Sequence, residues 1–150
     1  SKLLPVTPLA KLYKQKVYTR SMGEIGFEGT ITSGLGKGAV FVSIDYYKDK
    51  IKKKLGFEAY PGTLNLMIDK KQTNSFKKIK PIRIGGFKKD GKTFGRVSCY
   101  KIKINEIDAS IVIPELTEHN EDMIEIIAPM NLKSKLKVED GDKVKIELVH

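Results

Sequence analysis

Cysteine and histidine are nearly absent from this sequence of 150 residues, in which Cys99 is the only cysteine and His119 and His150 are the only histidines. A disulfide within the chain is therefore excluded, and a zinc site built from cysteine and histidine has too few ligands. No apolar run approaches the ~20 residues of a membrane-spanning helix, and the opening residues lack the charged-then-apolar order of a secretory signal. These absences lead us to expect a cytoplasmic protein with no membrane partner.

What the sequence does contain is typical of one globular domain with an excess of positive charge. Hydrophobic residues make up 40% of the chain, charged residues make up 31%, and the formal net charge is +10. The first 104 residues carry 23 basic and 7 acidic side chains, whereas the remainder carries 5 basic and 11 acidic. A basic body suits an anionic partner such as a nucleotide, phosphate or nucleic acid. A lysine-rich surface is also common in heat-adapted proteins, so both interpretations stay open.

Residues 1–24 differ from the rest of the chain. Pro5 and Pro8 interrupt them, and the chain opens with serine rather than methionine. We interpret residues 1–24 as a leader or linker and residues 25–150 as the folded domain.

Apolar and polar residues alternate along much of the chain from Ile25 onward, which is the pattern of half-buried strands. Asp90-Gly91 predicts a tight hairpin between strands at residues 82–87 and 93–104. The other segments for which we predict strands are residues 25–32, 40–44, 63–68, 110–113, 123–128 and 143–148.

Two short helices interrupt this pattern. Asp45 is predicted to cap the first and Gly56 to end it, whereas the second starts near Pro129. The apolar faces of the two helices would consist of Tyr47, Ile51 and Leu55 in the first and of Leu132 and Leu136 in the second. Seven or more short strands with two brief helices favour a mainly all-β protein folded as a small closed barrel.

The segment from Ser33 to Gly38 has glycine at every second position. Alternate glycines let the backbone approach a ligand closely and turn its N–H groups toward an anion. The segment matches neither the Walker pattern nor the dinucleotide fingerprint. Considered alone, it favours an ordinary glycine-rich hairpin loop over a ligand-binding loop.

Thr63 and Asn65 follow the turn at Pro61-Gly62 and would lie on one face of a strand, about 6.5–7 Å apart. Their neutral oxygens can reach one small hard cation, but they are too few to hold Mg²⁺ unless phosphates and waters complete its shell. The alternative, which the spacing alone favours, is the polar outer face of an ordinary strand.

Glu125 lies between apolar β-branched residues in a strand that looks buried, so its carboxylate needs a hydrogen-bonding partner. That partner is either a ligand or a neighbouring loop. His119 occurs in an acidic, polar stretch and is predicted to be solvated. Cys99 is predicted to be a small core residue rather than a nucleophile.

Taken together and in order, these segments resemble the archaeal CTP-dependent riboflavin kinases. The matching pieces are Ser33–Gly38, Leu55–Leu66, Ile111–Pro114, Thr117, Ile124–Pro129 and Asp140–Asp142, and the resemblance spans about residues 25–149. It implies a β-barrel of the cradle-loop type that transfers the γ-phosphoryl group of CTP to the 5′-hydroxyl of riboflavin, giving FMN and CDP.

The resemblance also implies a role for individual residues. Thr63 and Asn65 would ligate Mg²⁺, Thr117 and Glu125 would contact the flavin, and Glu125 is the candidate catalytic carboxylate. The cytidine nucleotide would be bound by Gly34, Leu35, Gly36, Lys37, Gly38, Ala39, Met130, Asn131, Leu132 and Lys133. We expect a monomer.

Two other function classes compete with this interpretation. A nucleic-acid-binding module or transcription regulator with a related barrel would explain the basic body, although the sequence has no clear recognition helix and no basic stripe interleaved with aromatic residues. A purely structural or interaction protein is the third possibility.

Overall fold

The computed structural model of this chain describes residues 18–19, 25–34, 41–115 and 122–149. Within these ranges the chain forms short strands joined by tight turns, together with three helices. The strands are β1 (Tyr18–Thr19), β2 (Ile25–Thr32), β3 (Leu64–Met67), β4 (Ile82–Ile84), β5 (Phe87–Lys89), β6 (Lys92–Phe94), β7 (Val97–Ile104), β8 (Ile107–Pro114), β9 (Met123–Ile127) and β10 (Lys143–Leu148), and the helices are α3 (Asp45–Leu55), α4 (Lys70–Lys77) and α5 (Leu132–Leu136).

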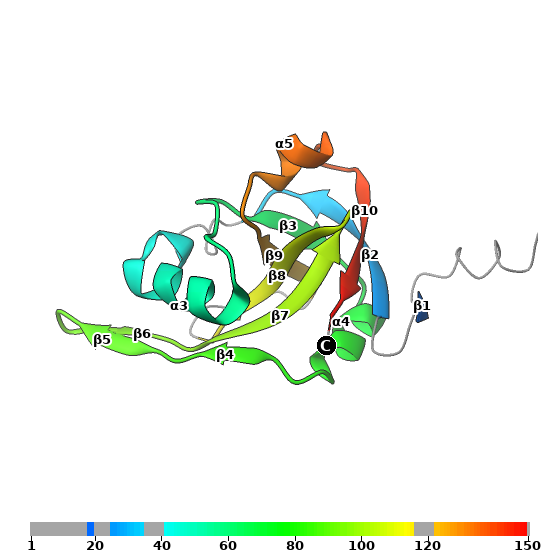
Figure 1. The fold of residues 1–150 in the computed structure, drawn as a ribbon. Helices are drawn as coiled ribbons and strands as arrows, with labels where there is room; N and C mark the ends of the chain where they lie inside the picture. The colour runs from blue at the N-terminus through cyan, green and yellow to red at the C-terminus, as the bar shows by residue number, and fades with distance from the viewer. Residues whose placement is uncertain (1–17, 20–24, 35–40, 116–121, 150) are drawn as a thin grey trace, which may run out of the picture.

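Six antiparallel strands close into a barrel (Figure 1). Their order is β2-β10-β7-β8-β9-β3, and β3 pairs with β2 to complete the circle. Closure pairs both edges of every one of these six strands, which removes the exposed edges that an open sheet would present. The prediction of a mainly β protein with a closed barrel is confirmed.

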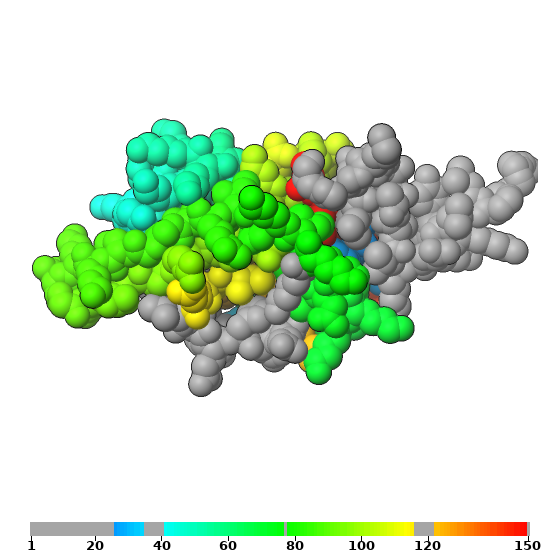
Figure 2. Space-filling view, turned by 90° about the horizontal axis from the view of Figure 1, so that it is seen from below, coloured from blue at the N-terminus to red at the C-terminus, as the bar shows by residue number. Residues whose placement is uncertain are grey.

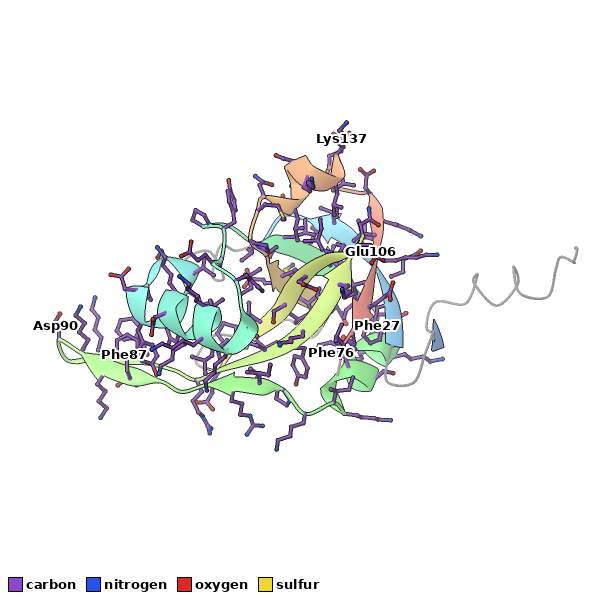
Figure 3. All side chains as sticks on the ribbon, in the orientation of Figure 1. Phe27, Phe76, Phe87, Asp90, Glu106 and Lys137 are labelled. Carbon is purple, nitrogen blue, oxygen red and sulfur yellow. The ribbon has the colours of Figure 1, made fainter. Side chains whose placement is uncertain are left out.

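The barrel interior is filled by every second residue of its strands, as the alternating pattern predicted. Leu64 and Leu66 of β3 and Ile124 and Ile126 of β9 are each at most 3% exposed. Helix α4 covers one end of the barrel, where the ring of Phe76 meets that of Phe27 edge-on with centroids 6.0 Å apart (Figure 3).

A second apolar cluster lies on the outside of the barrel, where helix α3 covers strands β7, β8 and β9. Tyr47, Ile51 and Leu55 form the buried face of α3, as predicted. Burying each of these side chains contributes about 1.5–3 kcal/mol. Gly56 ends the helix with a φ of 86°, also as predicted.

Cys99 lies in this outer cluster and is fully buried. Burial raises the pKa of its thiol to about 12, because the thiolate would lose its hydration. The prediction that Cys99 is a core residue rather than a nucleophile is confirmed.

Strands β5 and β6 form a hairpin that pairs with no strand of the barrel. Asp90 and Gly91 make its turn with φ values of 52° and 77°, which confirms the predicted hairpin. Each predicted flanking strand is divided in two, with breaks at residues 85–86 and 95–96. At the first break the backbone of Gly86 passes close to that of Phe94, because a Cβ atom at Gly86 would lie 2.3 Å from the Phe94 carbonyl oxygen. The hairpin projects beside α3 at one side of the molecule (Figures 1 and 2).

The predicted strand at residues 40–44 is wrong over its described part, because residues 41–43 are helical. The adjacent side chains of Phe41 and Val42 are both buried, at 5% and 1% exposure. Strand alternation cannot bury adjacent side chains on one face, whereas a helical turn can.

The predicted cap at Asp45 is also wrong. Ile44 is the N-cap of α3 without any side-chain hydrogen bond, and Asp45 is the first helical residue. A carboxylate in the first turn still interacts favourably with the helix dipole.

Helix α4 was not predicted at all, because its sequence has no apolar stripe. Its signal is instead a cap: the Asp69 carboxylate accepts a hydrogen bond from the backbone N–H of Gln72 at 2.9 Å. Asp followed by Gln three residues later resembles a capping box. Here the Gln72 side chain accepts from the backbone N–H of Glu28 and so joins α4 to β2.

None of the helices in the described ranges combines the length and the apolar character that crossing a membrane requires.

Candidate functional site

A pocket of about 330 Å³ opens at the rim of the barrel next to α5. Antiparallel pairing creates it: Thr32 at the end of β2 lies opposite Asn65 in β3, and Leu64 lies opposite Ile126 near the end of β9. The segment that leads into α5 completes the wall. The lining residues are Thr32, Ser33, Gly34, Tyr60, Gly62, Thr63, Leu64, Asn65, Ile126, Ala128, Met130, Asn131, Leu132 and Lys133.

The pocket therefore brings together segments that are far apart in the sequence and were predicted to act together. Of the residues predicted to bind the nucleotide, Gly34 and the four residues from Met130 to Lys133 line it. Both predicted metal ligands, Thr63 and Asn65, line it as well. As far as the described residues extend, the glycine segment and the threonine–asparagine pair share one cavity.

Gly34 lies directly against the side-chain amide of Asn65. A Cβ atom at position 34 would lie 2.1 Å from Asn65 Oδ1 and 2.2 Å from Asn65 Cγ. Nothing larger than hydrogen fits there, so the close approach of the two segments requires glycine at this position.

Asn65 is only 8% exposed, and its Oδ1 atom is buried without a hydrogen-bond partner among the described residues. A buried acceptor without a partner costs about 1–3 kcal/mol, so such atoms in native proteins commonly await a ligand, a water or an ion. A neutral amide oxygen beside the Thr63 segment fits a hard cation such as Mg²⁺, which prefers oxygen ligands. Thr63 itself precedes β3 rather than lying within it.

The side chain of Asp140 links two residues of the pocket wall, Ser33 and Lys133. Its carboxylate accepts a hydrogen bond from Ser33 Oγ at 2.7 Å through one oxygen, and from Lys133 Nζ at 2.7 Å through the other. Both contacts favour the charged carboxylate, so the Lys133 hydrogen bond and then the Ser33 hydrogen bond lower the pKa of Asp140. Asp140 thus holds the start of the glycine segment next to α5.

Replacing Asp140 with asparagine is expected to remove a pH-dependent part of the folding stability. Because the folded-state pKa of Asp140 lies below its ordinary value of 3.8, the contribution is present above that value and is lost as the pH falls through the folded-state pKa. The stability difference between wild type and Asp140→Asn should therefore be largest near neutral pH and shrink in acid. Urea unfolding at several pH values measures it; a difference that stays constant with pH contradicts the role of the charge.

A second contact joins the opposite walls of the pocket. Asn131 caps α5 by accepting the N–H of Ser134 at 3.2 Å, and its Nδ2 donates to the hydroxyl of Tyr60 at 3.3 Å. The backbone N–H of Tyr60 also donates to the carbonyl of Ala128 at 2.8 Å. Sequence reasoning gave no role to Tyr60 or to the side chain of Asp140. The contact of Tyr60 with Asn131 spans 71 residues, and that of Asp140 with Ser33 spans 107.

Glu125 lies opposite Asn65 in the β3–β9 ladder and opposite Val112 in the β8–β9 ladder. Its side chain is therefore on the same outer face of the barrel as that of Asn65, and it is half-buried rather than buried as predicted. Glu125 does not line the pocket wall. The remaining predicted site residues, Leu35, Gly36, Lys37, Gly38, Ala39 and Thr117, lie outside the described residues.

Residues 31–148 match the family model described as "CTP-dep_RFKase: Domain of unknown function DUF120". The chain is also similar to curated archaeal proteins called riboflavin kinase. The protein from Archaeoglobus fulgidus is 39% identical over 130 residues, which are 85% of this chain and 56% of that protein. The protein from Pyrococcus furiosus is 43% identical over 121 residues, or 79% of this chain and 56% of the relative.

A third relative, from Ignicoccus hospitalis, is 38% identical over 127 residues, which cover 81% of this chain and 70% of that protein. This chain spans little more than half the length of several of the relatives that it matches, including the one from Archaeoglobus fulgidus.

Proposed function

We propose, from the premise that this chain belongs to the family of CTP-dependent riboflavin kinases, that it transfers the γ-phosphoryl group of CTP to the 5′-hydroxyl of riboflavin. The products are FMN and CDP. In this reaction the 5′-oxygen of riboflavin bonds to the γ-phosphorus, the bond from that phosphorus to the β,γ-bridging oxygen breaks, and the hydroxyl proton is released.

The observation that carries this proposal is the contact between Gly34 and Asn65 inside the pocket. It places the backbone of Gly34, which carries no side chain, beside the buried Oδ1 atom of Asn65. That oxygen has no hydrogen-bond partner in the described part of the chain. Exposed backbone N–H groups suit phosphate oxygens, and a spare amide oxygen suits the cation that accompanies them. A nucleoside triphosphate with its metal is the ligand that satisfies both.

Phosphoryl transfer requires positioning and charge stabilisation more than acid–base chemistry, because its transition state is loose. Thr63 and Asn65 would hold Mg²⁺ together with phosphate oxygens. When bound, this ion neutralises charge that develops on the phosphates. Lys133 supplies a second positive charge, held in place through Asp140.

Glu125 remains the proposed catalytic carboxylate and, with Thr117, the proposed flavin contact. Its support is the strand register, which puts it next to Asn65 on the same face of the barrel. From that place its carboxylate would accept the proton of the riboflavin 5′-hydroxyl.

Incubating the purified chain with riboflavin, Mg²⁺ and each nucleoside triphosphate in turn tests the proposal, with FMN detected by chromatography. We expect FMN with CTP, and much less with ATP, GTP or UTP. Absence of FMN with every nucleotide contradicts the kinase assignment, and equal yields contradict the assignment of CTP as donor. Tight binding of DNA that weakens steeply with salt would instead support the nucleic-acid alternative.

A further inference from the structure

Hydrogen bonds and close contacts divide the pocket wall into two groups. In one group Gly34 touches Asn65, and Ser33 and Lys133 share the carboxylate of Asp140. This group is polar and carries the charge. In the other group Tyr60 and Asn131 are hydrogen-bonded to each other.

Tyr60 stands out because it is an aromatic residue left at 39% exposure, whereas most large apolar side chains in the described residues are buried or half-buried. It is nevertheless held firmly. Its hydroxyl accepts from Asn131, its N–H donates to Ala128, and its carbonyl accepts from the N–H of Gly62 at 2.8 Å. A Cβ atom at Gly62 would lie 3.2 Å from the Tyr60 ring, so the chain folds closely around its edge.

A ring that is fixed in place at its hydroxyl and at its backbone loses little further freedom when a ligand packs against it. Tyr60 is also near the polar group, because Thr63 is three residues away and their Cα atoms are at most ~11 Å apart. One nucleotide can therefore reach from the Thr63–Asn65 oxygens to the Tyr60 ring.

We propose that Tyr60 stacks against the pyrimidine ring of the nucleotide and that Asn131 orients the tyrosine for this contact. This inference rests on the proposed function for the identity of the ligand. Stacking on an aromatic side chain strengthens binding without distinguishing one base from another. Tyr60 thus contributes affinity for the nucleoside part of the ligand, and choice between cytosine and uracil lies with other groups.

The test measures dissociation constants by calorimetry, in Mg²⁺, for CDP, inorganic pyrophosphate and riboflavin. Replacing Tyr60 with alanine is expected to weaken CDP binding roughly 10- to 100-fold. Pyrophosphate and riboflavin binding should stay unchanged, because neither ligand uses this wall. Tyr60→Phe keeps the ring and should bind CDP within about threefold of wild type.

Met67→Ala is the matched control, since Met67 is 37% exposed and lines a different hollow of the surface. This variant should leave all three dissociation constants unchanged. Unaltered CDP binding by Tyr60→Ala overturns the inference, and so does an equal loss in Tyr60→Phe or a parallel loss of riboflavin binding. Wild-type protein that binds CDP but forms no FMN contradicts the proposed function and leaves the role of Tyr60 intact.

Discussion

Replacing Asn65 with leucine is expected to reduce FMN formation roughly 100-fold or more while leaving the fold intact. Leucine has nearly the shape of asparagine but offers no oxygen. At a position that is 8% exposed, it also removes a buried acceptor that has no hydrogen-bond partner in the part of the chain that the structure describes. The free energy of unfolding should therefore stay the same or rise. Turnover at saturating riboflavin and CTP, together with thermal unfolding, measures both effects.

Asn65→Asp is the companion variant for this experiment. It keeps an oxygen at the same place and adds a negative charge, so it should retain part of the activity and change the Mg²⁺ concentration needed for half-maximal turnover. Unchanged FMN production by Asn65→Leu would refute the metal role of this residue. Loss of activity together with a lower unfolding temperature would show that the asparagine is structural instead.

Gly34→Ala is the second substitution with a large expected effect, and it should impair both folding and activity. The added Cβ atom would lie 2.1 Å from Asn65 Oδ1, so either the glycine segment or β3 must move. Overpacking of this kind costs about 1–3 kcal/mol of folding stability. The displacement also separates the two elements that we propose to bind the phosphates, and turnover should fall with it. Urea unfolding and FMN formation measure the two losses.

Gly85→Ala is the matched control, because the nearest atom to its added Cβ would be the Tyr46 hydroxyl at 3.9 Å. Its stability should stay within about 0.5 kcal/mol of wild type. A double variant, Gly34→Ala with Asn65→Ala, removes the amide that the new methyl group meets. It should recover stability relative to Gly34→Ala alone, yet remain inactive. A Gly34→Ala protein with wild-type stability contradicts the close packing described above.

The strands of the barrel could be predicted from the sequence because their signal is local. In β2 and β3, apolar residues that face the core alternate with residues that face outward. This alternation alone fixes which side chains enter the core. Helix α3 was predictable for the same reason, since Tyr47, Ile51 and Leu55 recur at helical spacing.

The errors arose where packing rather than local pattern decides the conformation. Val42 is β-branched and favours a strand, yet it lies in a helical turn that buries it beside Phe41. Helix α4 has almost no apolar periodicity, and it forms because Asp69 caps it and Phe76 enters the end of the barrel. The Asp69–Gln72 pair was the one local signal that could have revealed it.

The features of the candidate site also fall into two kinds: those that a local sequence pattern predicts and those that depend on long-range packing. Thr63 and Asn65 are two residues apart, and both line the pocket although Thr63 precedes β3, so a local pattern was enough to group them. The contact of Ser33 with Asp140 depends on how the barrel closes, because the two residues lie 107 positions apart in the sequence. The same holds for the contact between Tyr60 and Asn131.

The buried thiol in the outer cluster makes the protein convenient to label. The chain has one cysteine, and at neutral pH it stays both protonated and enclosed beneath α3. A maleimide dye should therefore leave it untouched and react only with a cysteine introduced on the surface, for example in place of the exposed Lys88. Fluorescence experiments on ligand binding then need no cysteine-free background, and the native core can remain unaltered.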